Sequence, residues 1–315
     1  MTVAFDDIRA AAQRIAPIAR RTPVMRSGSF NRATGMEAFF KCENFQRGGA
    51  FKIRGAANFI YSMPEAARAG GVVAFSSGNH AQAVAIAAKS LGIKATLVMP
   101  DDAPKSKLEA TRSHGAEIVV YDRLKDSREA IGRRIAEETG ATLVPPFDHP
   151  WIIAGQGTAA LELIEETGPL DALVVCLGGG GLTSGCAIAA RALSPATRVF
   201  CVEPELANDY WLSRRAGHPV EIAPPPTIAD GLRTTKPGQY TFPLIQQLVE
   251  DILLVGDDEL RATMRFFMSR MKIVVEPSGA AAAAAVLHGK LPPGIKRAGI
   301  LVSGGNVDLD LLATL

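Results

Sequence analysis

Short apolar runs of strand length alternate with helical stretches through the middle of the chain, and this alternation restricts the folds that the chain can adopt. Val72–Phe75 and Ala95–Val98 are each followed by a helical stretch, and the pattern continues to Thr142–Val144. A strand, a crossover helix and a further strand form the unit from which parallel sheets are built. The sequence therefore predicts an α/β fold with a parallel sheet in this region.

A second series of strands follows later in the chain. It begins at Ala172–Leu177, which precedes a helix ending at Leu193, and continues with Val199–Val202, Ile252–Val255 and Ala298–Val302. A chain of 315 residues is also long for a single core. We therefore expect two sheets in two lobes.

Charge and cysteine usage exclude several classes of function. The net charge of +2 gives no bias toward polyanions, so no nucleic-acid partner is expected. The N-terminus lacks an apolar signal core and no uncharged run reaches the length of a membrane span, so no membrane partner is expected. The cysteines form neither a CxxC pair nor a disulfide framework, which favours reduced core residues in a cytoplasmic protein. They are Cys42, Cys176, Cys186 and Cys201.

Lys52 is the first candidate for chemistry. It lies in the octapeptide Gly49–Ala56, between apolar neighbours and with glycines close by on either side. A lysine held out of water has its charged form disfavoured, so its neutral amine can condense with an aldehyde near neutral pH. A surface helix lysine explains these eight residues as simply, so the prediction of a Schiff-base lysine depends on other segments.

A run of four glycines, Gly178–Gly181, lies where an apolar strand ends and an apolar helix begins. Successive glycines let several N–H groups point at one anion, and the helix N-terminus adds its positive dipole. This geometry suits a phosphate group. The run lacks the Walker lysine and the GxGxxG spacing, so neither a P-loop nor a dinucleotide fold is favoured. A tight strand-to-helix turn is the alternative explanation.

Two polar segments also directly follow predicted strands. In Ser76–His80, hydroxyl groups and a helix N-terminus could receive a carboxylate, and Asn79 could bond a ring hydroxyl; helix capping is the alternative. The second segment, Ser303–Asn306, follows the strand Ala298–Val302. The carboxyl ends of strands are where open α/β sheets bind ligands.

Together these motifs resemble the fold-type II pyridoxal phosphate enzymes, in the group of serine/threonine dehydratases, 3-hydroxyaspartate dehydratases and serine racemases. FKIRGA, SSGNH, AGQGT, GGGGL, ADG and SGGN occur in the family's order and approximate spacing over nearly the whole chain. The resemblance implies a two-lobe fold like that of the tryptophan synthase β subunit. We expect a small mobile substrate lobe at 72–147 and a large cofactor-binding lobe formed by 1–71 and 148–315.

The resemblance also implies roles for individual residues. Lys52 corresponds to the lysine that binds pyridoxal 5'-phosphate and removes the substrate's α-proton, and Phe51 would stack on one face of the cofactor. Asn79 would bond the ring hydroxyl. The phosphate cradle would comprise Gly178, Gly179, Gly180, Gly181 and Leu182.

Ser303 would face the pyridine nitrogen of the cofactor. A neutral hydroxyl does not enforce protonation of the ring, so the ring is a weaker electron sink. Negative charge at Cα is then better discharged by early loss of a β-leaving group. The expected reaction is β-elimination from a small-molecule amino acid such as L-threonine or L-serine, giving a 2-oxo acid and ammonia.

The resemblance leaves racemisation open. Ser77 matches the family serine on the cofactor face opposite Lys52, and an acid or base on each face permits inversion at Cα. The loop Pro145–Pro150 is more similar to the dehydratase version. The expected substrate-binding residues are Ser76, Ser77, Gly78, Asn79, His80, Arg233 and Thr234.

Arg233 makes a 3-hydroxyaspartate dehydratase a serious competitor. It follows the ADG motif near the presumed substrate loop, and a guanidinium is well suited to a second carboxylate. Gly48–Gly49 departs from the threonine or similar residue expected there. The alternative is that Arg233 points into solvent.

Glu203, Ala207 and Asp209 resemble a divalent-cation site of this branch, with oxygen ligands that suit Mg²⁺ or another divalent cation. An exposed acidic loop is the alternative. A homodimer is expected by family resemblance alone. Since the sequence ends at Leu315, directly after the predicted catalytic lobe, we expect no regulatory domain.

Two further classes of function remain open. One is a non-catalytic protein that senses an amino acid or the cofactor, which would not need the amine of Lys52. The other is β-replacement, as in cysteine synthases, whose motifs look less like SSGNH and ADG.

Overall fold

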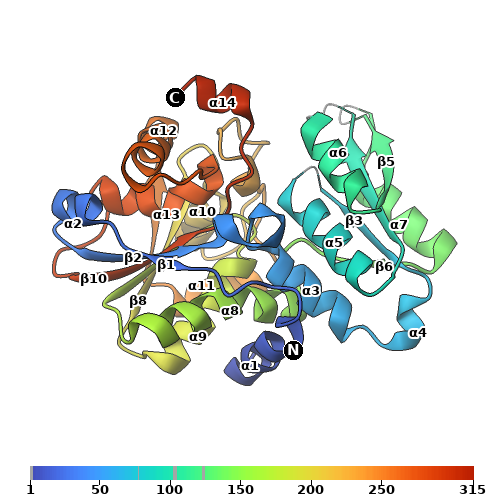
Figure 1. The fold of residues 1–315 in the computed structure, drawn as a ribbon, viewed down its shortest axis with the longest axis horizontal. Helices are drawn as coiled ribbons and strands as arrows, with labels where there is room; N and C mark the ends of the chain where they lie inside the picture. Colours follow the sequence, from blue (N-terminus) through green and yellow to red (C-terminus); the bar gives the residue numbers. More distant parts are fainter. Residues whose placement is uncertain (1–2, 77, 102–104, 123–124) are drawn as a thin grey trace.

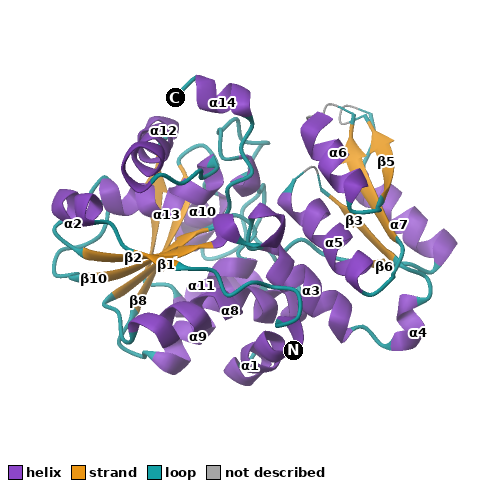
Figure 2. Ribbon diagram, in the orientation of Figure 1, coloured by secondary structure: helices purple, strands orange, loops and turns teal. Residues whose placement is uncertain are grey.

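The computed structural model describes residues 3–76, 78–101, 105–122 and 125–315. It contains two sheets, a six-stranded one in the order β1-β2-β10-β7-β8-β9 and a four-stranded one in the order β5-β4-β3-β6. Figure 1 places the smaller sheet and its helices beside the larger unit, and Figure 2 shows helices on both faces of each sheet. The predicted α/β architecture is confirmed.

The larger sheet is parallel except at one edge, where β1 pairs antiparallel to β2. Its central strands are buried on both faces, as expected for a parallel sheet covered by helices. Its strands are β1 (Val24–Met25), β2 (Glu37–Cys42), β7 (Ala172–Cys176), β8 (Arg198–Pro204), β9 (Asp251–Val255) and β10 (Arg297–Val302).

The smaller sheet is wholly parallel, and alternate residues of its strands face opposite layers. Val72 and Ala74 belong to the apolar cluster that contains α5, whereas Val73 packs with α7. Its strands are β3 (Val72–Phe75), β4 (Ala95–Pro100), β5 (Glu117–Tyr121) and β6 (Thr142–Leu143).

Helices connect and cover these strands. The α-helices are α1 (Phe5–Ile15), α2 (Gly28–Thr34), α3 (Lys52–Ser62), α4 (Glu65–Arg68), α5 (Asn79–Ser90), α6 (Lys105–Ser113), α7 (Arg128–Thr139), α8 (Pro150–Thr167), α9 (Gly181–Leu193), α10 (Asp209–Ala216), α11 (Thr241–Leu248), α12 (Asp257–Phe266), α13 (Pro277–Leu287) and α14 (Leu309–Ala313). Short 3₁₀ turns η1 (Glu43–Phe45), η2 (Arg47–Gly49) and η3 (Asp230–Leu232), and a π-helical turn η4 (Phe267–Met271), complete them.

The residue patterns explain two of these elements. Ala280–Ala285 forms the middle of α13, where every alanine is fully buried, because small side chains let this helix pack closely against the larger sheet. All four cysteines are free and buried, as predicted. No helix in the described ranges combines the length and apolar character needed to cross a membrane.

Helix α3 joins the two units. It packs against α8 on the side of the larger sheet and against α5 on the side of the smaller one (Figure 1). Its first residue is Lys52, so whatever fixes the start of α3 also fixes this amine.

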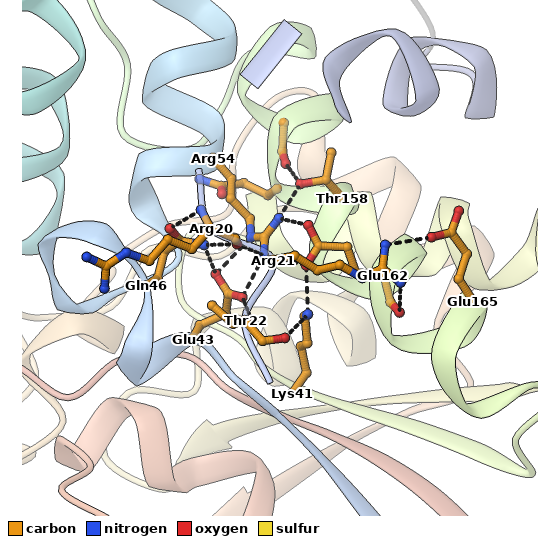
Figure 3. A network of polar contacts seen from close by, with 12 residues as sticks. Arg20, Arg21, Thr22, Lys41, Glu43, Gln46, Arg54, Thr158, Glu162 and Glu165 are labelled. Carbon is orange, nitrogen blue, oxygen red and sulfur yellow. Dashed lines mark hydrogen bonds and ion pairs between the residues drawn. The ribbon is translucent and has the colours of Figure 1, made fainter. Parts of the chain in front are cut away.

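A buried charge network holds this helix. Arg54 is fully buried and donates through Nε and Nη2 to the two carboxylate oxygens of Glu43, both at 2.8 Å. It also donates to both oxygens of Glu162 on α8, at 2.7 and 2.8 Å (Figure 3). Lys41 Nζ lies 2.6 Å from Glu162 Oε2 and donates to the carbonyl of Thr22.

The network satisfies charges that burial disfavours. Burial alone would raise the pKa of Glu43, but the charge and hydrogen bonds of Arg54 hold it below its ordinary value. A buried charge is tolerated only when its partners are in place, so the network requires η1, α3 and α8 to be assembled together.

We expect Arg54→Met to lower the free energy of unfolding by about 3–5 kcal/mol, because Glu43 and Glu162 then stay buried without their guanidinium partner. The measurement is the midpoint of urea unfolding. The control is Arg21→Met, whose ion pair with Glu165 leaves the side chains 54% and 47% exposed and is expected to matter by less than about 1 kcal/mol. Equal losses in the two variants would contradict this account.

Candidate active site

One cavity of about 700 Å³ gathers every predicted cofactor and substrate residue that the structure describes. Its walls come from both sheets: the segment after β3, the glycine run after β7 and Ser303 after β10 lie around the start of α3. The predicted residues along it are Phe51, Lys52, Ser76, Gly78, Asn79, His80, Gly178, Gly179, Gly180, Gly181, Leu182, Arg233, Thr234 and Ser303. Ser77 lies outside the described residues.

Lys52 projects its amine into this cavity. Its Nζ donates to the carbonyl oxygen of Pro146 at 2.9 Å and lies 5.2 Å from the centre of the Phe51 ring. Burial lowers the pKa of Lys52 to about 8 from 10.5, although the charge of Glu276 opposes the shift. Roughly a tenth of the amine is then neutral and nucleophilic at pH 7, far more than in a free lysine.

Two positions of the glycine run, Gly179 and Gly180, leave no room for a side chain. Gly180 has a φ of 86°, and a Cβ there would lie 2.6 Å from Tyr210 Oη. A Cβ on Gly179 would overlap the ring of Phe147. Tyr210 Oη also donates to the carbonyl of Gly179 at 3.0 Å and so orients the loop. Helix α9 starts at Gly181 without a side-chain cap at Gly180, so its first-turn N–H groups are suited to bind an anion.

The segment after β3 begins α5. Ser76 Oγ accepts a hydrogen bond from the backbone N–H of Gly78, and His80 Nε2 lies 3.1 Å from the carbonyl oxygen of Val144. Burial and the charge of Lys52 lower the pKa of His80 to about 3, so its imidazole is neutral. Asn79 bonds Glu276 and Asn306, and it also lines the cavity.

Arg233, the residue predicted to bind a second carboxylate, uses only part of its guanidinium in the hydrogen bond that the structure shows. Arg233 is exposed, lines the cavity and donates through Nε to the carbonyl of Thr227 at 2.8 Å. Thr234 also lines the cavity, and its hydroxyl donates to Asp209 Oδ1 at 3.1 Å. Thr234 thus connects the cavity to the candidate metal ligands.

The candidate metal ligands are buried, which removes the alternative of an exposed acidic loop. Glu203 and Asp209 have no exposed surface. Burial and the charge of Asp209 raise the pKa of Glu203, and burial raises the pKa of Asp209 to about 6. Asp209 Oδ2 finds no hydrogen-bond donor among the described residues. Ala207 is also buried.

These two carboxylates do not form a complete protein cage. The described part of the chain has no group of three or more His, Cys, Asp or Glu side chains that could hold a metal. The donor set of two carboxylates and a carbonyl fits a hard cation such as Mg²⁺, which keeps several of its waters.

A family model described as pyridoxal-phosphate dependent enzyme matches residues 15–304. The chain belongs to this family. Its architecture is that of the fold-type II enzymes. The walls of the cavity suit the cofactor, because they present a reactive amine for an aldehyde, a glycine cradle for a phosphate and a hydroxyl for a ring nitrogen.

Relatives and solved structures cover nearly the whole of this pyridoxal-phosphate dependent enzyme. It is 53% identical to an L-threo-3-hydroxyaspartate ammonia-lyase of a Pseudomonas species, over 99% of this chain and 98% of the relative. It is 52% identical to a serine racemase of Schizosaccharomyces pombe, over 98% of this chain and 96% of the relative. The structure of maize serine racemase matches with a TM-score of 0.96 and 44% identity, over 100% of this chain and 97% of the other.

Sequence reasoning missed several residues of the cavity wall. Arg128, the first residue of α7, lines the cavity from the smaller sheet, and Asp308 lines it from the C-terminal segment. Neither lies in a motif, so only packing reveals them. Cys176 lines the cavity too, and burial raises the pKa of its thiol to about 11, which makes it a poor nucleophile.

We expect the uptake of pyridoxal phosphate by the cofactor-free chain to accelerate as pH rises, with a midpoint near the Lys52 pKa of about 8. The rate rises in this range because a lowered pKa places the neutral, nucleophilic amine at lower pH than in a free lysine. Stopped-flow absorbance over a pH series measures the rate, and Lys52→Gln is the blank. A midpoint near 10.5, the ordinary lysine value, would show that the amine is solvated.

Proposed function

We propose that this enzyme removes water from a β-hydroxy amino acid by β-elimination and releases a 2-oxo acid and ammonia. The observation that carries the proposal is the enclosed amine of Lys52 in the same cavity as the hydroxyl of Ser303. The amine suits removal of a proton, and a neutral hydroxyl at the ring nitrogen favours early loss of the β-leaving group. The names of the ammonia-lyase relatives agree with this reaction.

Each wall of the cavity has a task in this reaction. When bound, the cofactor supplies the electron-withdrawing group that acidifies the substrate's Cα–H. Lys52 Nζ takes that proton, and its lowered pKa raises the share of neutral amine that can do so. The N-terminus of α5, with Ser76 and Gly78, receives the α-carboxylate. Gly178–Gly181 and Leu182 hold the phosphate, and Phe51 packs beside the ring.

The substrate class favoured by the cavity is a β-hydroxy amino acid with a second carboxylate. Arg128 from the smaller sheet and Arg233 from the larger one line the same cavity, and a guanidinium binds a carboxylate through paired hydrogen bonds. A 3-hydroxyaspartate fits this pair better than L-serine or L-threonine. Movement of the small lobe, 72–147, toward the large lobe would bring the two arginines together and exclude water.

Racemisation is the second candidate. It is favoured by the likeness to serine racemases, which covers 98% of the chain in one relative and 100% in a solved structure. It requires Ser77 to act on the face of the substrate opposite Lys52. We further propose that the enzyme works as a cytoplasmic homodimer, and that Mg²⁺ or another divalent cation binds Glu203, Ala207 and Asp209.

Turnover by the purified, pyridoxal-phosphate-loaded enzyme tests the proposal. L-Serine, L-threonine and the isomers of 3-hydroxyaspartate are supplied separately, and 2-oxo acid and D-amino acid are assayed together. Oxo acid from any of them supports β-elimination. D-Serine as the main product supports the racemase, and the absence of both products from all substrates contradicts the proposed function.

We expect Arg128→Ala and Arg233→Ala each to raise the KM for 3-hydroxyaspartate by at least about tenfold, because each removes a charge-assisted hydrogen bond to the second carboxylate. The KM for L-serine should change little, since serine has no such group. Arg133→Ala is the matched control, because Arg133 is exposed on α7 and does not line the cavity. Equal effects on both substrates would argue against a dicarboxylate site.

We expect Mg²⁺ to raise the thermal unfolding midpoint of the enzyme, because a cation relieves two buried carboxylates. At a hundredfold excess over its dissociation constant the stabilisation is about 2.7 kcal/mol. Asp209→Asn should abolish the effect. Glu205→Gln should retain it, because Glu205 lies in the same loop but is exposed. If Mg²⁺ does not change the unfolding midpoint of the unmodified chain, the proposed metal site is wrong.

A further inference from the structure

We propose that Asn306 is a positioning residue that sets the orientation of the Asn79 carboxamide, and thereby fixes the N–H that α5 presents to the cofactor. The inference rests on the proposed role of Asn79 in holding the cofactor. Asn306 itself does not line the cavity, but it touches the residue that does.

A directed chain of hydrogen bonds runs from the backbone to Asn79. Asn306 Nδ2 donates to the carbonyl oxygen of Gly48 at 2.7 Å. A carbonyl can only accept, so the nitrogen end of the Asn306 amide must face it. The same nitrogen donates to Asn79 Oδ1 at 2.8 Å, which places the oxygen of Asn79 on this side.

The other end of Asn79 is then determined. Its Nδ2 donates to Glu276 Oε1 at 2.8 Å, and an ionised carboxylate only accepts. Turning the Asn79 amide over would set oxygen against the carboxylate of Glu276 and nitrogen against the amide nitrogen of Asn306. Both contacts would be repulsive, so the Gly48 carbonyl fixes the amide of Asn79 through Asn306.

The count of donors shows what remains for a ligand. An amide nitrogen carries two N–H groups. Asn306 uses both, on Gly48 and on Asn79. Among the described residues, Asn79 donates one of its two N–H groups to Glu276. Its second N–H can therefore donate to a ligand in the cavity, which Asn79 lines together with Lys52.

The backbone is shaped to admit this chain. Gly49 has a φ of 73°, and a Cβ there would overlap the carboxamide of Asn306. A Cβ on Gly304 would overlap the carboxylate of Glu276. The backbone N–H of Gly305 donates to the carbonyl of Gly49 at 2.8 Å, and Ala50 forms a bridge with Gly304. Gly49 thus makes room for Asn306 shortly before Lys52, and Gly304 makes room for Glu276 after β10.

The chain also joins the two sheets. Asn79 starts α5 on the smaller sheet, whereas Asn306 and Glu276 follow or precede elements that pack on the larger one. The orientation of the amide is therefore set across the junction, next to the amine of Lys52. A substitution at Asn306 should alter cofactor binding without touching the cofactor.

Asn306→Asp tests the inference. The aspartate cannot donate to Gly48 and draws the nitrogen of Asn79 toward itself, which turns the Asn79 amide over. We expect pyridoxal phosphate to leave the enzyme about five- to tenfold faster, the effect of one lost hydrogen bond, and the absorption maximum of the bound cofactor to shift. Release is followed by absorbance after the freed cofactor is trapped, with no substrate present.

Asn44→Asp is the matched control. Asn44 also donates through Nδ2 to a backbone carbonyl, that of Val274 at 3.1 Å, and packs against Gly305, but it has no recorded contact with Asn79 in the described structure. We expect this variant to lose stability like Asn306→Asp while it retains the cofactor at the wild-type rate and with the wild-type spectrum.

The double variant Asn306→Asp, Glu276→Gln distinguishes an effect of the Asn79 amide orientation from a general loss of stability. Glu276→Gln alone is its reference. The carboxamide that Glu276→Gln introduces can donate to the oxygen of the turned Asn79 amide, so the two hydrogen bonds of Asn79 return with reversed direction, whereas the bond to Gly48 stays lost. We expect the unfolding midpoint to recover in part and cofactor release to stay fast relative to Glu276→Gln. Recovery of both, or a wild-type release rate in Asn306→Asp, would overturn the inference.

These results are separable from the proposed reaction, because cofactor release is measured without substrate. A wild-type enzyme that retains pyridoxal phosphate but turns over no β-hydroxy amino acid contradicts the proposed function alone. Fast release from Asn306→Asp in that same enzyme supports the inference about the amide.

Discussion

The burial of Arg54 between two carboxylates is the constraint on which the active site depends. Its guanidinium has no exposed surface and is bonded by Glu43 of η1 and Glu162 of α8 (Figure 3). Such a charge is stable only if all its partners are present, so the larger sheet, η1 and α8 have to meet at this point. Lys52 lies two residues before Arg54 in the same helical turn, so the contacts that fix Arg54 also fix the backbone of Lys52.

The site then follows from parallel-sheet geometry. The carboxyl ends of β3, β7 and β10 open toward the start of α3, and each is followed by a segment that lines the cavity. In the proposed function the N-terminus of α5 serves the substrate carboxylate and that of α9 serves the phosphate. Within the described residues the amine of Lys52 bonds a backbone carbonyl and has no ion pair with a carboxylate, so burial can lower its pKa.

Much of this could be predicted from the sequence, because strand-ending motifs and the apolar setting of Lys52 are local signals. The contacts that organise the motifs are not local. Arg54 reaches Glu162 across 108 positions and Asn306 reaches Asn79 across 227, and no spacing rule reveals such pairs. Arg128 enters the cavity only because α7 packs on β3. The burial of Glu203 likewise depends on how α10 covers the end of β8.

The most direct test of this account is to locate the cofactor on the chain. The enzyme loaded with pyridoxal phosphate is reduced with borohydride, digested and analysed by mass spectrometry. The account predicts one pyridoxyl group, on Lys52, and its loss together with the visible absorbance in Lys52→Gln. A label on another lysine, or none on a chain that still binds the cofactor, would contradict the central role of the enclosed amine.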